Sequence, residues 1–166
     1  MYDFHCHLIT DNAYFCKKET MIDKRYPDVP LQAELAKKEL IENKKSNRVS
    51  TLHCVRSTEL MMNILKEVKP LPKTVLWHSF NGSRETAEEL YKLGIIISIS
   101  PKCTKNIKEL VTANPLFALE TDYTGTSREE HFLILKNHYI NVAKLLNISV
   151  EELEKRCIEN AVAFTV

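Results

Sequence analysis

The chain begins with two residues that could do chemistry, His5 and His7, at the end of the apolar run 1–8. Side chains alternate along a β-strand, so at this spacing both imidazoles share one face, with Cα atoms about 6.6 Å apart. Two neutral imidazoles on one face can bind a single metal ion. The pair alone leaves open an ordinary strand with one metal-free and one solvent-facing histidine.

Three more metal-competent residues close β-like runs further along the chain. His53 ends the run 49–53, His78 ends 74–78, and Asp122 ends 115–122. The carboxyl ends of parallel strands in an α/β fold lie on one side, so these groups are expected to converge with His5 and His7. Each could separately be a core histidine or a cap, but their joint placement favours a metal site.

This ligand set indicates hydrolytic chemistry. Imidazoles with a carboxylate suit Zn²⁺, Mn²⁺ or similar divalent ions. Such an ion lowers the pKa of bound water toward about 7, and Asp122 is the predicted catalytic residue that takes the water's proton. His131 and His138 fall within a predicted helix, and we interpret them as surface or core-edge residues.

The surrounding pattern predicts one α/β domain over residues 1–166. Five short apolar runs alternate with helical segments, which is typical of a parallel sheet with right-handed crossovers. A complete eight-stranded barrel usually needs about 200 residues or more, so the pattern predicts either a reduced barrel or a doubly wound sheet. Residues 9–30 show no clear periodicity and are predicted to be irregular.

The net charge, the cysteines and the few glycines exclude some classes of protein but do not identify the function. The net charge of +1 argues neither for nor against a nucleic-acid partner. Five widely spaced cysteines without a C-x-x-C motif indicate no disulfide framework, and we expect a cytoplasmic protein. The sequence shows no signal peptide and no long apolar run, so no membrane partner is expected. Three glycines exclude a glycine-rich phosphate loop.

Several motifs together resemble the TatD-type DNases, a branch of the amidohydrolase-like TIM barrels. The matching segments, in the family's order, are D-F-H-C-H-L (3–8), T-L-H-C (51–54), W-H-S-F-N-G-S (77–83), L-G-I-I-I-S-I-S (93–100), L-E-T-D (119–122) and I-S-V-E-E-L-E-K-R-C-I-E-N-A (148–161). The resemblance implies a reduced TIM-like barrel of about five to six parallel strands. It also implies a hydrolase of phosphodiester bonds, most often a deoxyribonuclease, that uses one or two divalent ions (Mg, Mn or Zn).

Site roles also follow from the resemblance. His5 and His7 correspond to ligands of one metal ion, and Asp122 to a ligand and water activator. His53 and His78 correspond to ligands of a second ion or of the bound phosphate. Arg56 stands one residue later than the family's arginine and is the candidate for binding substrate phosphate.

The chain also departs from the family pattern. The family's bridging glutamate, in a Gly-Glu-Ile-Gly-like strand, has no counterpart in residues 9–30, where about two βα units are expected to be absent. Carboxylates that could substitute for it are Asp11, Glu19, Asp23 and Asp28. The departure leaves open a non-catalytic relative that binds metal or nucleic acid, and a hydrolase of another ester. A reduced barrel also predicts a second copy or protein partner over the gap.

Overall fold

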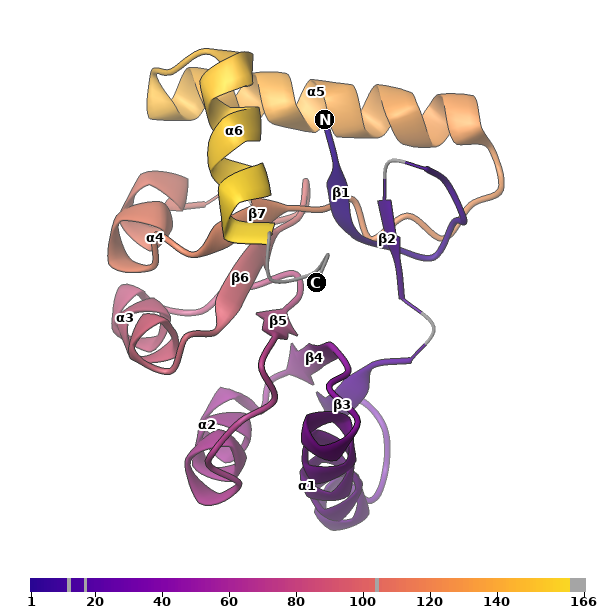
Figure 1. Cartoon of the computed structure of the whole chain (residues 1–166), viewed down its shortest axis with the longest axis vertical. Coiled ribbons are helices and arrows are strands. Elements are labelled where there is room, and N and C mark those ends of the chain that lie inside the picture. The colour runs from indigo at the N-terminus through magenta and orange to yellow at the C-terminus, as the bar shows by residue number, and fades with distance from the viewer. Residues whose placement is uncertain (12, 17, 104, 162–166) are drawn as a thin grey trace. The chain divides into compact units, whose positions relative to one another are not determined.

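The computed structural model describes residues 1–11, 13–16, 18–103 and 105–161. The chain forms two compact units, residues 18–77 and residues 1–17 with 78–166. Each unit contains parallel strands that alternate with helices along the chain (Figure 1). The predicted α/β class is therefore confirmed.

The unit 18–77 is a three-stranded parallel sheet with two helices. Its elements are β3 (Thr20–Asp23), α1 (Val29–Lys45), β4 (Ser50–Val55), α2 (Thr58–Glu67) and β5 (Val75–Trp77). The strand order is β3-β4-β5, with Asp23 opposite Val55 and Leu52 opposite Trp77. The Asp28 side chain caps α1 by accepting a hydrogen bond from the Leu31 amide at 3.3 Å, and Pro30 lies in the first turn, where no amide is needed.

The other unit carries the remaining strands and four helices. Its elements are β1 (Asp3–Cys6), β2 (Ala13–Phe15), α3 (Arg84–Lys92), β6 (Ile96–Ile99), α4 (Ile107–Ala113), β7 (Phe117–Leu119), α5 (Arg128–Leu146) and α6 (Val150–Ala161). Strands β1 and β2 pair in parallel, as do β6 and β7. Ser83 and Ser127 cap α3 and α5 with their hydroxyl groups, which accept from the amides of Thr86 and Glu130.

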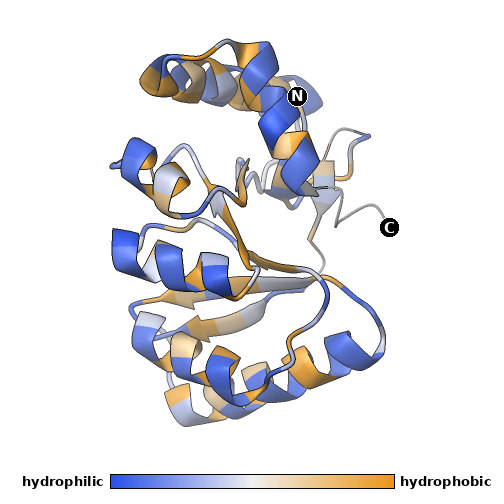
Figure 2. Ribbon diagram, turned by 60° about the vertical axis from the view of Figure 1, so that its left-hand side comes forward, coloured by the Kyte–Doolittle hydropathy of each residue, from blue (hydrophilic) through white to orange (hydrophobic). Residues whose placement is uncertain are grey.

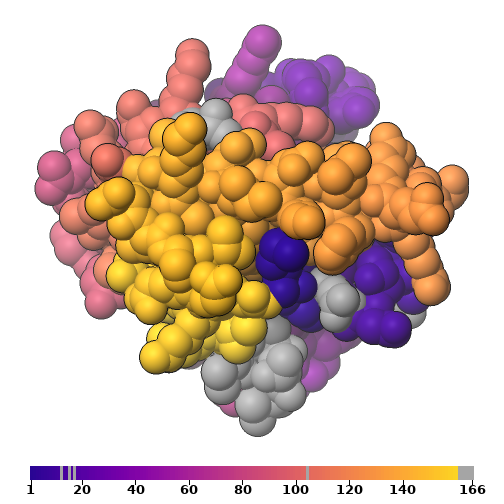
Figure 3. Space-filling model, turned by 90° about the horizontal axis from the view of Figure 1, so that it is seen from above, coloured from indigo at the N-terminus to yellow at the C-terminus, as the bar shows by residue number. Residues whose placement is uncertain are grey.

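The start of the chain is held by the last two helices of this unit. Tyr139 on α5 donates its hydroxyl hydrogen to the carbonyl of Tyr2 at 2.8 Å, and the terminal amine pairs with Glu154 on α6. Figure 3 shows the first residues between α5 and α6. These contacts fix the N-terminal end of β1, the strand that carries His5.

Each unit has an apolar core between its strands and helices. The strands are apolar along most of their length, whereas the helices are hydrophilic on their outer faces (Figure 2). The core of 18–77 includes Ile22, Leu40, Leu52, Met61, Ile64, Leu65 and Leu76, and that of the other unit includes Phe4, Phe80, Leu90, Ile95, Ile97, Leu119 and Tyr139. Among the described residues, no helix is long and apolar enough to cross a membrane.

The structure corrects the sequence prediction for residues 9–30. This stretch is not irregular throughout, because it contains β2 and β3. Strand β3 pairs with β4 over four residues, and its Thr20, Ile22 and Asp23 are buried. Strands of three or four residues are too short to show periodicity in sequence, so only their parallel partners reveal them.

Candidate metal centre

Three of the predicted ligands meet in the unit formed by residues 1–17 and 78–166. His5 Nε2 lies 3.8 Å from Asp122 Oδ1, and His7 Nε2 lies 3.7 Å from the same oxygen. One donor atom from each of the three residues lies within 4.8 Å of the other two. His5 is fully buried, whereas a third of the His7 side chain and a quarter of Asp122 are exposed. The group is therefore reachable from solvent on one side.

Backbone hydrogen bonds hold these ligands side by side. The Asp122 amide donates to the carbonyl of His5 at 3.0 Å, and the His7 amide donates to the carbonyl of Tyr123 at 2.9 Å. The end of β1 thus runs beside the segment that follows β7. Asp122 has φ 53°, a left-handed conformation that aspartate tolerates better than most residues and that is often kept at functional sites.

His78 joins this group through ring stacking. Its ring lies against that of His5, with centroids 4.2 Å apart and planes inclined by 23°. His78 Nδ1 lies 3.5 Å from Glu120 Oε1. A carboxylate beside one nitrogen of a metal-binding histidine orients the ring and leaves its other nitrogen for the ion. Glu120 therefore has the position of an orienting partner for His78.

Glu120 is a fully buried carboxylate held by serines. Ser79 donates to its Oε1 from the amide at 2.8 Å and from the hydroxyl at 2.6 Å, and the Ser98 hydroxyl donates to Oε2. Burial raises the pKa of Glu120, but the hydrogen bond and charge of His78, with smaller effects of His5 and Ser79, bring it below its usual value. Glu120 is therefore an anion inside the protein.

His53 belongs to the other unit, where it lies between two carboxylates. Its Nδ1 is 3.2 Å from Glu19 Oε2, and its Nε2 is 3.3 Å from Asp23 Oδ2. The hydrogen bond with Glu19 raises the pKa of His53 above its usual value, although burial opposes it. Asp23 is buried and also accepts hydrogen bonds from Nε and Nη2 of Arg25, which hold the pKa of the carboxyl well below its usual range.

Arg56 lies on the rim of a cleft in the same unit as His53. The cleft has a volume of about 320 Å³ and is lined by Lys24, Arg56 and the first turn of α2. Both cations are exposed. Arg56 has φ 54°, so an arginine is kept here in a backbone conformation that favours glycine. The cleft brings together two positive charges, the carboxylate of Glu59 and the amino end of a helix, where anions are stabilised.

The structure thus brings together four of the five predicted ligands, His5, His7, His78 and Asp122, within one unit. It also adds residues that sequence reasoning missed. Glu120 stands next but one to Asp122 in the L-E-T-D motif, and an acid at the end of an apolar strand is the sequence signal that could have found it. The sequence indicates Glu19 only as a loop carboxylate, because no pattern marks β3.

The donor set fits a divalent ion. Ligand atoms bind Zn²⁺ at about 2.0–2.2 Å, so two ligands of one ion lie up to about 4.4 Å apart. The separations of 3.7 and 3.8 Å lie within that limit and are too long for hydrogen bonds between the same atoms. His5, His7 and Asp122 would therefore hold the ion, with two imidazole nitrogens and one carboxylate oxygen.

Comparison with solved structures defines the fold class. The crystal structure of the TatD homologue YjjV from Escherichia coli K12 matches with a TM-score of 0.70 and 22% identity, over 88% of this chain and 61% of that one. A hydrolase TatD family protein from Entamoeba histolytica matches with a TM-score of 0.69 and 15% identity, over 91% and 62% of the two chains. The fold is thus a TIM-like barrel in incomplete form, and the chain spans about three fifths of the length of these structures.

The family follows from the sequence itself. The family model described as TatD related DNase matches residues 20–165. The chain belongs to that family, as its motifs predict. A search of curated proteins gives no match.

Proposed function

We propose that the chain is a metal-dependent hydrolase that cleaves phosphodiester bonds, with DNA as the substrate. One observation carries this proposal: the two imidazoles and one carboxylate of His5, His7 and Asp122 converge at a partly exposed site in a TatD-family fold. Zn²⁺ and Mn²⁺ suit such a ligand set, and the family resemblance adds Mg²⁺ as a candidate. The family model is described as a DNase, which supports DNA over other esters.

The residues of the site have distinct roles in this proposal. A divalent ion held by His5, His7 and Asp122 would polarise a phosphoryl oxygen and lower the pKa of bound water toward about 7. Asp122 turns Oδ1 toward the two imidazoles, while its Oδ2 lies 3.6 Å from Lys102 Nζ. In this proposal Asp122 orients the attacking water and accepts its proton, and the positive charge of Lys102 lies beside Oδ2.

Glu19 is the carboxylate that we propose in place of the family's bridging glutamate. It directly precedes β3 and approaches His53 Nδ1 at 3.2 Å. Asp23 is less suited, because its oxygens are already engaged by Arg25. Asp11 and Asp28 are exposed, and Asp28 caps α1. In this proposal His53 and Glu19, which lie in the same unit, serve a second ion or the bound phosphate.

Arg56 is the proposed phosphate-binding residue. A guanidinium can bind a phosphate through two parallel hydrogen bonds. The nearby charge of Lys24, on the same cleft, adds attraction for a polyanionic backbone. Substitution of Arg56 should therefore weaken substrate binding more than it slows the chemical step.

The direct test is hydrolysis of single-stranded DNA by the purified chain. We expect cleavage with Mn²⁺ or Mg²⁺, loss of cleavage in EDTA, and recovery when the ion is restored. His5→Ala and Asp122→Ala should abolish it, whereas Asp11→Asn, at an exposed carboxylate, should leave it unchanged. Metal binding without hydrolysis would favour the non-catalytic relative, and hydrolysis that both variants retain would contradict the proposal.

A second copy or protein partner over the incomplete barrel remains a prediction. Size-exclusion chromatography with light scattering tests it for a homo-oligomer. A dimer at micromolar concentration is the expected result, and a monomer at all concentrations would contradict self-association.

A further inference from the structure

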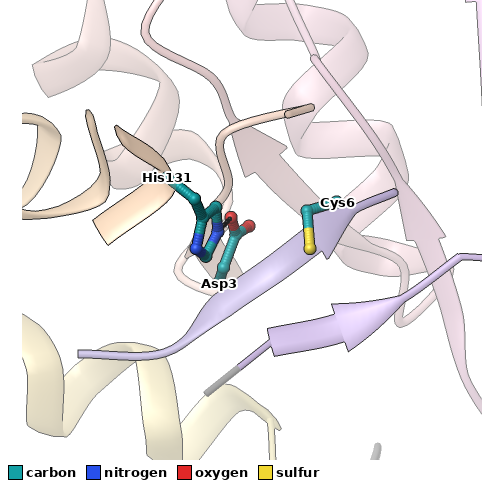
Figure 4. Close-up of side chains that lie close together, drawn as sticks. All are labelled: Asp3, Cys6 and His131. Atoms are coloured by element: carbon teal, nitrogen blue, oxygen red, sulfur yellow. Dashed lines mark hydrogen bonds and ion pairs between the residues drawn. The ribbon is translucent and has the colours of Figure 1, made fainter. Parts of the chain in front are cut away.

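A second cluster of metal-competent side chains lies behind the proposed metal centre. It consists of Asp3 and Cys6 on β1 and His131 on α5 (Figure 4). Asp3 and Cys6 are fully buried, and His131 is 3% exposed. His131 Nε2 lies 2.8 Å from Asp3 Oδ2. A carboxylate and an imidazole in direct contact inside the protein need an explanation, because burying them costs free energy unless they are well partnered.

This cluster is not a second metal site. Asp3 already accepts four hydrogen bonds: Oδ1 from the amides of His5 (3.1 Å) and Thr121 (3.0 Å), and Oδ2 from the Thr121 hydroxyl (2.5 Å) and His131. A carboxylate offers about four lone-pair positions, so these donors use its capacity. Cys6 donates its thiol hydrogen to the carbonyl of Leu8, and burial raises the pKa of Cys6 to about 11.

We propose that Asp3, held by His131, is the positioning residue of the metal centre. This inference rests on the proposed function and concerns how its ligands are placed. Two of the four donors to Asp3 are the amide of His5 itself and the amide of Thr121, which immediately precedes Asp122. One carboxylate therefore holds together the backbones of two proposed ligands that are far apart in the sequence.

The bonds of Asp3 continue the backbone pairing between these segments. The Thr121 amide bonds to Asp3 Oδ1, the Asp122 amide to the His5 carbonyl, and the His7 amide to the Tyr123 carbonyl. The Asp3 side chain thus extends this row of bonds by one position. Its fixed geometry also supports the left-handed backbone of Asp122, which persists only where the surroundings hold it.

His131 holds the second oxygen of the Asp3 carboxylate, Oδ2, in place. It approaches Asp3 from α5 and so connects the carboxylate to a helix that bears none of the proposed ligands. Without this donor, Oδ2 would keep only the Thr121 hydroxyl. Partners behind metal ligands typically change metal affinity by about 10–100-fold when they are removed.

The test is the affinity of the whole chain for Mn²⁺, measured by calorimetric titration without substrate. We expect His131→Leu and Asp3→Asn to weaken binding at least 10-fold. His131→Gln keeps an N–H donor toward Asp3 and should recover most of the affinity. The matched control is His138→Leu: His138 is also 3% exposed on α5, but its Nε2 bonds to the carbonyl of Ile99 at 2.8 Å.

Both leucine variants should lose stability, so unfolding cannot distinguish a positioning role from a merely structural one. Affinity can: wild-type affinity in folded His131→Leu, or equal losses in His131→Leu and His138→Leu, would overturn the inference. If Asp3→Asn does not fold, the His131 pair decides. A wild-type chain that binds no Mn²⁺ would instead overturn the metal centre and, with it, this role for Asp3.

Discussion

The rings of His5 and His78 stack on one another, with centroids 4.2 Å apart and planes inclined by 23°. His5 comes from β1 and His78 from the segment that follows β5, so the contact joins residues that are 73 positions apart in the chain. Behind the pair lies the buried anion Glu120, at 3.5 Å from His78 Nδ1. The stacked rings therefore depend on a carboxylate that is itself held by Ser79 and Ser98.

Glu120→Gln should destabilise the protein strongly. The amide group of glutamine would bring N–H hydrogens against the donors of Ser79 or Ser98, and the charge that their hydrogen bonds stabilise would be lost. We expect a decrease of about 2–4 kcal/mol in the free energy of unfolding, measured with urea in the presence of EDTA. Glu88→Gln, at a partly exposed glutamate that pairs with Arg84, is the control and should change stability by less than about 0.5 kcal/mol. Equal effects of the two substitutions would contradict the role of Glu120.

The acid sensitivity of the fold should depend partly on His138. Burial lowers the pKa of His138, while the bond to Ile99 and the charges of Glu120 and Asp3 oppose this only in part. The folded state therefore binds a proton here less readily than the unfolded state, and stability is lost as the pH falls below the unfolded value of about 6.5.

His138→Leu removes this contribution. In EDTA, the free energy of unfolding of the wild type should fall more between pH 7.5 and pH 5.5 than that of the variant, because only the wild-type unfolded chain gains the proton at this position. Urea unfolding at the two pH values measures both slopes. Parallel slopes would show that His138 titrates alike in the folded and unfolded states.

The strand-end ligands could be predicted because simple periodicity and topology place them. The i, i+2 spacing puts His5 and His7 together, and the rule that parallel strands end on one side brings Asp122 to them. The prediction that His131 and His138 are surface or core-edge residues is wrong, because both are buried. Their spacing with Leu135 and Val142 follows one helical face, and this signal was available in the sequence.

Other features could not be predicted from the sequence. Strands β2 and β3 are three and four residues long, and such segments become strands through their pairing with β1 and β4 rather than through any pattern of their own. The position of Glu19 beside His53 could not be predicted either, because it depends on the pairing of β3 with β4. The hydrogen bonds of Asp3 to Thr121 and His131 span more than a hundred residues, and no local signal encodes them.

The five cysteines should differ in reactivity. Cys6, Cys16 and Cys157 are buried, whereas Cys54 and Cys103 are partly exposed. Burial raises the pKa of Cys157 to about 12 and that of Cys54 to about 11, so access rather than thiolate content decides the order. With iodoacetamide at pH 8, mass spectrometry should find Cys54 and Cys103 modified first and the other three only in denaturant. Early modification of Cys157 would contradict the packing of α6.

Replacing Arg56 by glycine should weaken substrate binding without lowering the stability of the fold. Its left-handed φ of 54° costs an arginine about 1–2 kcal/mol, whereas glycine adopts this conformation freely. Arg56→Gly also adds about 0.4–1 kcal/mol of unfolded-state entropy, so the net effect should be no change or a gain of up to about 1.6 kcal/mol in the free energy of unfolding. The loss of the guanidinium should raise KM for DNA about 10-fold or more with little change in kcat.

Asn147→Gly is the matched control, because Asn147 also has a left-handed φ, of 57°, at the end of α5. This substitution should leave KM unchanged. A large fall in kcat with KM unchanged would instead place Arg56 in the chemical step.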